Sequence, residues 1–470
     1  MIRHFATRIA LSLGTLAVVA SAHAQTPALT PVQREGREIF KELIEINSAH
    51  QTGSTKPVVA AIAKRFRAAG FPERDIHVIG PAGDKDPNII VWIHGSSSAL
   101  KPILLLAHLD VVEAKRADWS LDPYTFTEKD GFFYGRGTSD IKGGAATLIS
   151  AMLRLKREHV TPKRTIIMAL TAGEESGAGY NGVDWLVKNH RDLIDAELCL
   201  NVDGGDPQIK NGKRVLRAVQ TSEKIYTSFR LDVTNRGGHS SLPPRENAIY
   251  RLAAALGRLS QFQFPVHLDE TTRAFFERSA ALESGQTAAD MHAIAANASD
   301  SAVAARLSMS TYFNAQLRTT CVPTMLEGGH APNALPQLAR AIVNCRIVPS
   351  ETPAETKATL LRVIADDSIH VVAMDAVPGA AASPLSPTVM EPLERVTKML
   401  SPGVPIVPVM ETGATDGAYL RPAGIPTYGV SGIYLDVEDI RAHGRDERIM
   451  VKEFYDGLEY IYQLVKAIGG

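Results

Sequence analysis

Acidic and histidine residues follow several apolar runs of this sequence, and they are the residues best suited to chemistry. His108 and Asp110 close the run that begins at Ile103. Residues two positions apart in an extended chain face the same way, so Asp110 can hold one ring nitrogen of the imidazole while the other binds a metal. A satisfied structural histidine is the alternative, and this pair alone does not exclude it.

Two adjacent carboxylates, Glu174 and Glu175, come after the next apolar run, at residues 165–170. Repulsion and loss of solvation both disfavour two ionised carboxylates side by side at the end of a buried strand. A cation beside them removes that cost. We favour this interpretation over an exposed loop held by salt bridges.

Asp140, Asp203 and His443 complete the candidate set. Asp140 comes just before a predicted helix, where a helix N-cap is the alternative, and Asp203 follows a fourth apolar run. The strand ends of an open α/β sheet converge on one crevice, and histidine and carboxylate ligands without cysteine are typical of catalytic zinc sites. Together the residues predict a metal-dependent reaction at one edge of a sheet.

The elements that must position these residues alternate between strand and helix patterns. Residues 33–48, 57–69 and 144–159 have the apolar spacing of helices. Short continuous apolar runs between them suit covered strands, so the sequence predicts an α/β domain with helices on both faces of a sheet. These runs are residues 89–93, 103–107, 165–170 and 198–202.

The pattern changes near residue 225, which indicates an inserted domain. Residues 225–233 alternate as a half-buried strand does, and an alanine-rich, helical stretch follows at 269–317. Catalytic-domain patterns resume after Pro349. We predict a smaller α+β domain at residues 218–349, between two parts of a catalytic domain at 25–217 and 350–470.

The first residues have the composition of a secretory signal peptide. Arg3 and Arg8 precede an apolar run at 9–20, and small residues follow as far as Ala24. The run is too short to span a bilayer as an anchor. We therefore expect cleavage of residues 1–24, a periplasmic or secreted protein, and no membrane anchor afterwards.

The overall composition is that of a globular protein without a nucleic-acid footprint. Fifty Lys and Arg residues balance 51 Asp and Glu residues, and no basic stripe occurs, which argues against nucleic-acid binding. The three cysteines fit neither a disulfide framework nor a zinc knuckle. We expect buried free thiols at Cys199 and Cys345, and assign no function to these or to Cys321.

The ordered motifs resemble the M20 metallopeptidases, a family of carboxypeptidases, dipeptidases and aminoacylases. The similarity covers almost all of the mature chain, and residues 312–348 look most like the carboxypeptidase S and N-fatty-acyl-amino-acid hydrolase branch. It implies a zinc-exopeptidase-type mixed sheet and an inserted lid domain that mediates a homodimer. The motifs are Ala107-His108-Leu109-Asp110, Gly135-Arg136-Gly137-Thr138-Ser139-Asp140, Gly173-Glu174-Glu175, Asp203, Gly237-Gly238-His239-Ser240-Ser241, Thr412-Gly413-Ala414-Thr415-Asp416 and His443.

The resemblance assigns a role to each residue of the candidate set. Glu174 would be the general base, and Asp110 would orient His108. The peptide bond between Asp140 and Ile141 would be cis. Two Zn²⁺ ions are implied for each subunit, with Co²⁺ or Mn²⁺ as alternatives. The implied ligands are His108 and Asp203 for one ion, Glu175 and His443 for the other, and Asp140 as a bridge between them.

The resemblance also implies substrate-binding residues. Arg346 and Asn333 would clamp the substrate carboxylate, assisted by Gly413 and Thr415, although a structural ion pair also explains Arg346. His239 would reach the active site of the partner subunit and stabilise an oxyanion there. Simple turn chemistry is the alternative for this histidine.

Two departures from the family pattern bear on the substrate. Ala414 stands where many relatives have glycine, and Asp203 stands where biosynthetic deacylases have glutamate. Together with the export signal, Asp203 favours a peptide or an N-acyl amino acid. We therefore expect a zinc carboxypeptidase or dipeptidase, with an aminoacylase as the alternative. A non-catalytic periplasmic binding protein is a distant third, because a binder has no need of Glu174.

Overall fold

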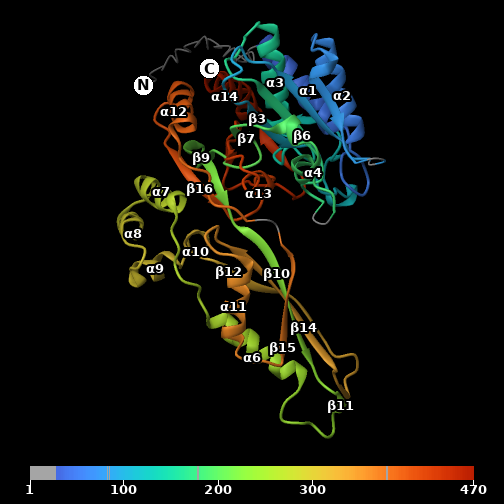
Figure 1. Cartoon of the computed structure of the whole chain (residues 1–470), viewed down its shortest axis with the longest axis vertical. Coiled ribbons are helices and arrows are strands. Elements are labelled where there is room, and N and C mark those ends of the chain that lie inside the picture. Colours follow the sequence, from blue (N-terminus) through green and yellow to red (C-terminus); the bar gives the residue numbers. More distant parts are fainter. Residues whose placement is uncertain (1–27, 82, 84, 177–178, 377–378) are drawn as a thin grey trace, which may run out of the picture.

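The computed structural model describes residues 28–81, 83, 85–176, 179–376 and 379–470, and it shows two domains. The predicted leader at residues 1–24 lies outside the described residues. Of the helices that are described, none is long and apolar enough to cross a membrane. The larger domain lies at the top of Figure 1, and the smaller one extends below it as an elongated arm.

A ten-stranded mixed sheet forms the centre of the larger domain. The strands that lead into the candidate site, β3, β6 and β7, are parallel neighbours, whereas β1 and β2 pair antiparallel at one edge. Strand β16 (Ile406–Glu411) pairs with β9 outside the main order. That order is β1 (Ile76–Ile79), β2 (Asn88–Ile93), β6 (Ile166–Thr171), β3 (Ile103–His108), β7 (Leu198–Asn201), β17 (Thr427–Gly429), β9 (Lys213–Glu223), β8 (Gln208–Lys210) and β18 (Leu435–Asp436).

Helices cover both faces of this sheet, as predicted. Every residue of β3 and β6 is buried, because successive side chains point into opposite apolar layers. In β3, Ile103 and Leu105 join one core cluster, whereas Leu104 joins the other. The first cluster includes α1 (Pro31–Glu45), α2 (Lys56–Ala68), α3 (Lys142–Arg157), α12 (Pro387–Leu400) and α14 (Val451–Gly469). The second includes α4 (Gly182–Asn189), α5 (Arg191–Ile194) and α13 (Gly417–Leu420).

The smaller domain is an antiparallel four-stranded sheet covered by two helices. Its strand order is β12 (Thr320–Gly328), β14 (Leu338–Ile347), β10 (Ile225–Thr234) and β15 (Ile369–Ala376). Helices α6 (Ala248–Gln261) and α11 (Pro353–Ile364) pack on it. The predicted boundary at residue 349 differs from this arrangement, because α11 and β15 complete the same sheet and core although they follow Pro349.

A helical unit formed by residues 270–317 packs against the larger domain instead of the smaller sheet. Its apolar side chains form one core with Leu216 and Ala218 of β9 and with Val407 and Val409 of β16. In Figure 1 it lies beside β16, at the junction of the two domains. The unit consists of α7 (Glu270–Ser279), α8 (Gly285–Ala296), α9 (Ser301–Leu307) and α10 (Thr311–Leu317).

Two small sheets complete the described chain. One contains β4 (Thr127–Lys129), β5 (Phe132–Tyr134) and β19 (Arg448–Met450), and it brings the segment before Asp140 next to the segment after His443. The other pairs β11 (Gly238–His239) with β13 (Ala334–Leu335) at the far end of the arm in Figure 1.

The expectation of a free thiol at Cys345 is wrong. Cys321 of β12 and Cys345 of β14 are directly opposite in the register, with Cα atoms 4.1 Å apart, and they form a disulfide. The sequence pattern missed this bond because strand pairing, and not spacing along the chain, brings the two thiols together. Cys199 is a buried free cysteine, as predicted.

Candidate active site

The ends of β3 and β7 and the loop before α3 bring three predicted ligands together. Nε2 of His108 lies 3.2 Å from Oδ1 of Asp140 and 3.9 Å from Oδ2 of Asp203. His108 is buried, with an exposed fraction of 2%. The N-cap of α3 is Ile141, without a side-chain cap bond, so Asp140 is not the helix cap that the sequence left open.

The loop after β6 and a distant loop near the C-terminus supply the second group. Nε2 of His443 lies 2.8 Å from Oε1 of Glu175 and 2.9 Å from Oδ2 of Asp140. The two oxygens of Asp140 therefore face two different histidines. One carboxylate between two His–carboxylate groups is the donor arrangement of a bridging ligand, so these residues fit a two-metal site.

The electrostatics of the cluster also favour bound cations. Burial and the neighbouring carboxylates raise the pKa of Glu174 and of Asp203 well above the usual range, although His108 opposes the shift. Hydrogen bonds to Asp140 and Glu175 raise the pKa of His443 to about 10. So many acidic groups in one buried place are costly unless positive charge compensates them. A pair of divalent cations would supply that charge.

Glu174 shares the site with the predicted ligands. It forms, with His108 and Glu175, a further group of donors close enough for a metal. Among the described residues, no Lys or Arg forms an ion pair with Glu174 or Glu175, and the basic partner of Glu175 is His443, itself a predicted ligand. Glu174 therefore lies beside the cluster without a Lys or Arg partner, so its carboxylate can accept or donate a proton.

Asp110 contacts His108 in a way that the sequence did not specify. Nδ1 of His108 donates to the backbone carbonyl of Asp110 at 3.0 Å, whereas the Asp110 carboxylate lies 3.8 Å away. That carboxylate accepts the backbone N–H of Glu175 at 3.0 Å. Asp110 therefore fixes the imidazole of His108 through its main chain and fixes the Glu175 loop through its side chain.

Glu447 is a structural residue of the site whose role sequence reasoning missed. One of its oxygens accepts Nη1 of Arg136 at 2.6 Å and the N–H of Gly137 at 3.0 Å. The other accepts the N–H and hydroxyl of Ser139 and the N–H of Asp140, at 2.8, 3.0 and 3.1 Å. Arg136, Gly137, Ser139 and Asp140 belong to a recognised motif, but Glu447 belongs to none, and nothing in the motif indicates that it pairs with Glu447.

Arg136 joins the same clamp to the His443 loop. Its Nη2 donates to the carbonyl of Gly444 at 2.9 Å. The buried Arg136–Glu447 pair therefore holds the loops of Asp140 and His443 in one arrangement. The peptide bond between Asp140 and Ile141 in this clamped segment is cis, as the resemblance implied.

Asp416 is another buried acid that received no role from the sequence. It accepts hydrogen bonds from Thr171 at 3.1 Å and from Asn181 at 2.7 Å. Burial raises its pKa to about 6. The sequence could have indicated this role only through the position of Asp416 at the end of the Thr412–Asp416 motif. Through Thr171, Asp416 ties the start of α13 to β6, the strand that precedes Glu174 and Glu175.

A cavity of about 540 Å³ adjoins Glu174, Glu175 and His443, and Arg346 and Gly413 line it as well. The Arg346 guanidinium lies 4.7 Å from the centre of the Tyr226 ring. Burial lowers the pKa of Arg346, and among the described residues no carboxylate forms an ion pair with it. The ion pair that the sequence left open for Arg346 is therefore not what the structure contains.

The other residues of the predicted carboxylate clamp differ in their positions. Thr415 lines the same cavity, but its hydroxyl and N–H both donate to Glu223, at 2.8 and 2.9 Å. Asn333 is exposed and lies beside β11, where its carbonyl accepts the N–H of Ser240 at 3.0 Å. Strand β14 separates it from Arg346, so one chain does not bring the two together.

His239 also lies away from the cluster within one chain. It belongs to β11 at the far end of the arm in Figure 1, and it is exposed. Its Nδ1 lies 2.7 Å from the Ser241 hydroxyl and accepts the N–H of Ser241. These are turn contacts, and among the described residues Nε2 forms no hydrogen bond or ion pair.

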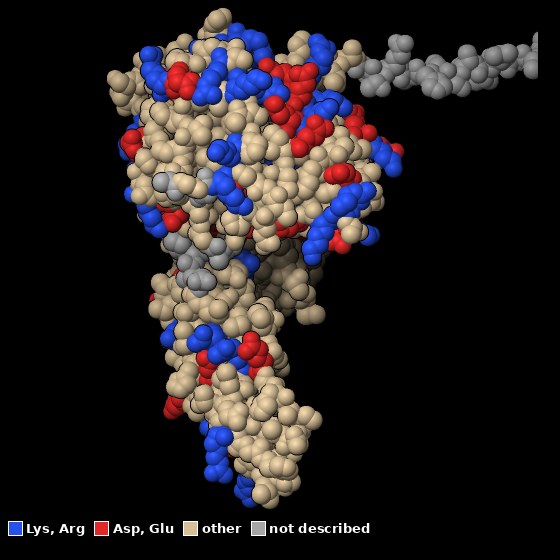
Figure 2. Space-filling model, turned by 90° about the vertical axis from the view of Figure 1, so that its right-hand side faces the viewer, with Lys and Arg blue, Asp and Glu red and all other residues tan. Residues whose placement is uncertain are grey.

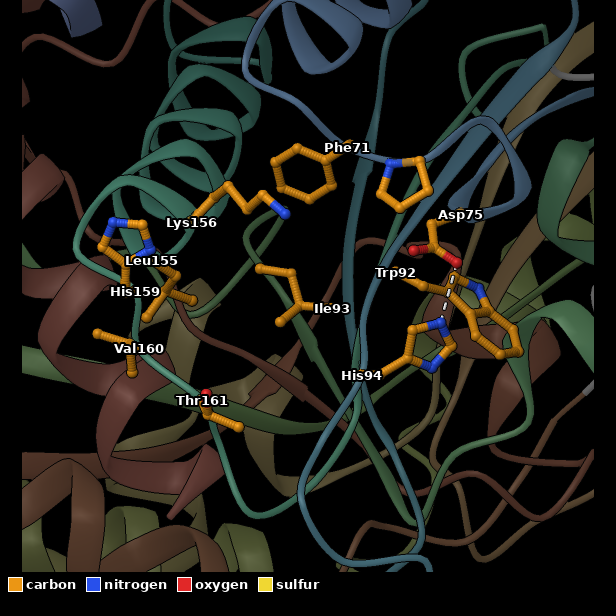
Figure 3. Close-up of a pocket in the computed structure, with 11 residues that line it drawn as sticks. Phe71, Asp75, Trp92, Ile93, His94, Leu155, Lys156, His159, Val160 and Thr161 are labelled. Atoms are coloured by element: carbon orange, nitrogen blue, oxygen red, sulfur yellow. Dashed lines mark hydrogen bonds and ion pairs between the residues drawn. The ribbon is translucent and has the colours of Figure 1, made fainter.

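A separate hollow of about 300 Å³ lies between β2, α3 and the segment after α2, and it contains none of the candidate residues. Figure 3 shows Lys156 and Phe71 on one side and the Asp75–His94 pair, at 2.9 Å, on the other. Its buried acid, Asp75, is already paired with His94, and the hollow lies apart from all the candidate residues. The chemistry is concentrated at the His–carboxylate cluster.

Comparison with known proteins agrees with this geometry. The chain is 30% identical over 385 residues to the human N-fatty-acyl-amino acid synthase/hydrolase PM20D1, which covers 80% of this chain and 75% of that protein. It is 28% identical over 387 residues to the probable carboxypeptidase S-like 2 of Dictyostelium discoideum, covering 79% and 72% of the two chains.

Among solved structures, the M20 family metallo-carboxypeptidase Sso-CP2 of Sulfolobus solfataricus has the same fold. The two structures superpose with a TM-score of 0.70 at 17% identity, over 93% of this chain and 99% of that chain. The sequence pattern of Peptidase family M20/M25/M40 matches residues 104–467. The chain therefore belongs to the M20/M25/M40 family of metallopeptidases and related hydrolases.

Proposed function

We propose that this protein is a two-zinc hydrolase that cleaves an amide bond next to a free carboxylate. The observation that carries the proposal is a single cavity that contains Glu174, the His443–Glu175 group and the unpaired Arg346. A basic group able to bind a carboxylate through two hydrogen bonds thus lies beside a metal-binding cluster and the acid Glu174. Hydrolysis of an amide next to a carboxylate uses all three features, namely the carboxylate-binding arginine, the metal cluster and the acid.

The residues divide the reaction between them. His108, Asp203, Glu175, His443 and the bridging Asp140 would hold the metals, which when bound lower the pKa of water and polarise the scissile carbonyl. Glu174 takes a proton from the attacking water and delivers it to the leaving amine. Burial raises the pKa of Glu174, which favours its acting as a proton acceptor. Arg346 holds the substrate carboxylate and so places the amide at Glu174.

Two substrate classes share this chemistry. The 30% identity to an N-fatty-acyl-amino acid synthase/hydrolase favours N-acyl amino acids, and we place them first. The similarity to a carboxypeptidase S-like protein supports peptides with a free C-terminus as the second candidate. Both classes have a carboxylate for Arg346 and differ only in the acyl half.

We also propose a homodimer in which His239 acts in the partner's active site. Strand β12 is an edge strand of the smaller sheet, and its apolar residues Val322, Met325 and Leu326 are 57%, 58% and 66% exposed. Such an edge is suited to pairing with another chain. Figure 2 shows fewer charged side chains on the smaller domain than on the larger one. Asn333 lies beside His239 and would enter the same partner site.

Mixing two inactive variants tests the dimer. We expect His239→Ala and Glu174→Ala each to be nearly inactive alone. A mixed dimer would contain one site with both defects and one site with neither, so mixing should restore activity. If subunits exchange and activity stays absent, His239 does not act in the partner's site.

The disulfide supports export as the proposed location. Structural disulfides persist in oxidising compartments and are rare in the cytosol. Cys321–Cys345 is such a bond in a β-sheet, and residues 1–24 have the composition of a signal peptide. We therefore retain a periplasmic or secreted location as a proposal.

Amide hydrolysis is tested with the purified full chain loaded with zinc. Free amino acid released from N-acyl amino acids and dipeptides is quantified with an amine reagent, before and after removal of metal with a chelator. We expect release that stops with the chelator and returns with zinc. Absence of release from every substrate by zinc-loaded, folded protein would contradict the proposed function.

A further inference from the structure

A second cavity, of about 240 Å³, adjoins the metal cluster through Asp140 and Asp203. It shares no lining residue with the cavity of Arg346, which adjoins Glu174, Glu175 and His443. Because Oδ2 of Asp140 lies 2.9 Å from His443, the two cavities meet across the cluster. A substrate whose amide lies at the cluster can therefore extend one half into each cavity.

The helical unit of residues 270–317 builds one wall of this second cavity through Tyr312, in the first turn of α10. The Tyr312 ring packs edge-to-face against Phe275, with centroids 5.8 Å apart. The unit is fixed to the larger domain, because Gln316 donates to the carbonyl of Met410 at 2.9 Å and Thr271 bonds Thr221 at 2.6 Å. Tyr312 is thus held in place over the cluster.

Apolar side chains from the segment before His443 also line this cavity. Ile440 is 64% exposed although it is a large apolar residue at the cavity, and Tyr312 is 45% exposed. A ligand that covered both would remove apolar surface from water, which favours an apolar occupant. We call this space the Tyr312 cavity, and its apolar residues are Ile141, Ala218, Tyr312, Val409, Leu435, Val437, Ile440 and Ala442.

Charge determines which half of the substrate enters which cavity. Besides Asp140 and Asp203 of the cluster, Asp206 and Glu411 line the Tyr312 cavity, and among the described residues neither of these two forms an ion pair with a basic side chain. Arg346 lines the other cavity, together with the acids Glu174, Glu175 and Asp416. No basic residue of the described chain lines the Tyr312 cavity, and burial raises the pKa of Asp206 and of Glu411 there. A substrate carboxylate can therefore pair with Arg346 in one cavity, whereas the other would bury it without a basic partner, which is costly.

We propose that the Tyr312 cavity binds the acyl half of the substrate and selects apolar acyl groups without a negative charge at their far end. The helical unit would then set acyl specificity through Tyr312. This inference rests on the proposed amide hydrolysis and adds to it the acyl class and the residue that selects it.

The test is a series of N-acyl leucines hydrolysed by the full-length, zinc-loaded protein. From acetyl to hexanoyl, kcat/KM should rise about fourfold for each methylene that enters the cavity. Adipoyl has the same number of carbons as hexanoyl but ends in a carboxylate, and kcat/KM for it should be at least about tenfold lower. Glu411→Gln should reduce the difference between hexanoyl and adipoyl substrates.

Tyr312 variants locate the effect. Tyr312→Ala should reduce the hexanoyl-to-acetyl ratio of kcat/KM about tenfold, whereas Tyr312→Phe, which keeps the ring, should preserve it. Met309→Ala is the matched control, because Met309 lies close by in the chain, is 87% exposed and does not line the cavity. Thermal melting and zinc content check that each variant is folded and loaded.

The outcomes separate the inference from the proposed function. Hydrolysis with equal kcat/KM for acetyl, hexanoyl and adipoyl substrates would overturn the acyl cavity and leave amide hydrolysis standing. A chain-length preference that Tyr312→Ala leaves unchanged would also overturn it. Absence of hydrolysis of every N-acyl amino acid and dipeptide would instead contradict the function itself.

Discussion

Glu447 offers the sharpest test of how the chain holds its metal-binding loops. It is fully buried and accepts hydrogen bonds from Arg136, Gly137, Ser139 and Asp140. Glu447→Gln keeps the shape but replaces one acceptor oxygen with an NH₂ group. That group would face donors, and the buried Arg136 would lose its counter-charge.

The structure sets the size of the expected effect. Removing one partner of a buried ion pair costs about 3–5 kcal/mol of stability, because it leaves an uncompensated charge. Loss of a residue that orients metal ligands lowers metal affinity about 10–100-fold. Both effects should occur here, since Glu447 fixes the backbone N–H of Asp140 and pairs with Arg136, which holds the His443 loop. Zinc affinity, measured by competition with a chromophoric chelator, and thermal melting give the two readings.

A matched control separates stability from metal binding. Glu453 is also buried and ion-paired, with Arg214, but it lies in α14 and contacts no candidate ligand. Glu453→Gln should lower the melting temperature and leave zinc affinity unchanged. If Glu447→Gln likewise lowers only the melting temperature, the two loops are not held by this residue and the reasoning is refuted.

Three further predictions follow from single side chains. Glu174→Gln should reduce kcat about 10²–10⁴-fold while zinc content stays at the wild-type level, and loss of zinc would make Glu174 a ligand instead of the base. Arg346→Ala should reduce kcat/KM for substrates with a free carboxylate far more than for their amides, and equal losses would mean a structural role. Burial lowers the pKa of Lys224 to about 7 from 10.5, so the unfolded chain binds more protons between these values and stability should rise with pH there. Lys224→Met should therefore stabilise the protein more near pH 7 than near pH 10, and a pH-independent change in melting temperature would contradict the shift.

Much of the fold follows from local sequence patterns. Continuous apolar runs predicted β2, β3, β6 and β7, because a strand covered on both faces needs apolar residues at every position. The motif residues at the ends of these strands predicted the cluster, since parallel strands bring their carboxyl ends to one edge. His108, Asp140, Glu174, Glu175, Asp203 and His443 indeed lie together.

What the sequence left undecided depends on pairing between distant segments. Spacing did not reveal the Cys321–Cys345 bond, because antiparallel register alone places these residues opposite each other. The position of Asn333 beside His239, and not beside Arg346, follows from the length of β14. The helical unit of residues 270–317 has an apolar face, but the sequence does not name its partner, which proved to be β16 and β9.

The sequence by itself determined which residues bear the chemistry and which segments are strands or helices, because side-chain type and periodicity are local properties. Only the tertiary structure decided how those residues are held. Arg136 and Glu447 are 311 positions apart, and their buried contact joins the loops of Asp140 and His443. No local pattern encodes such a contact, since it exists only after the sheet and the loops at its edge have packed.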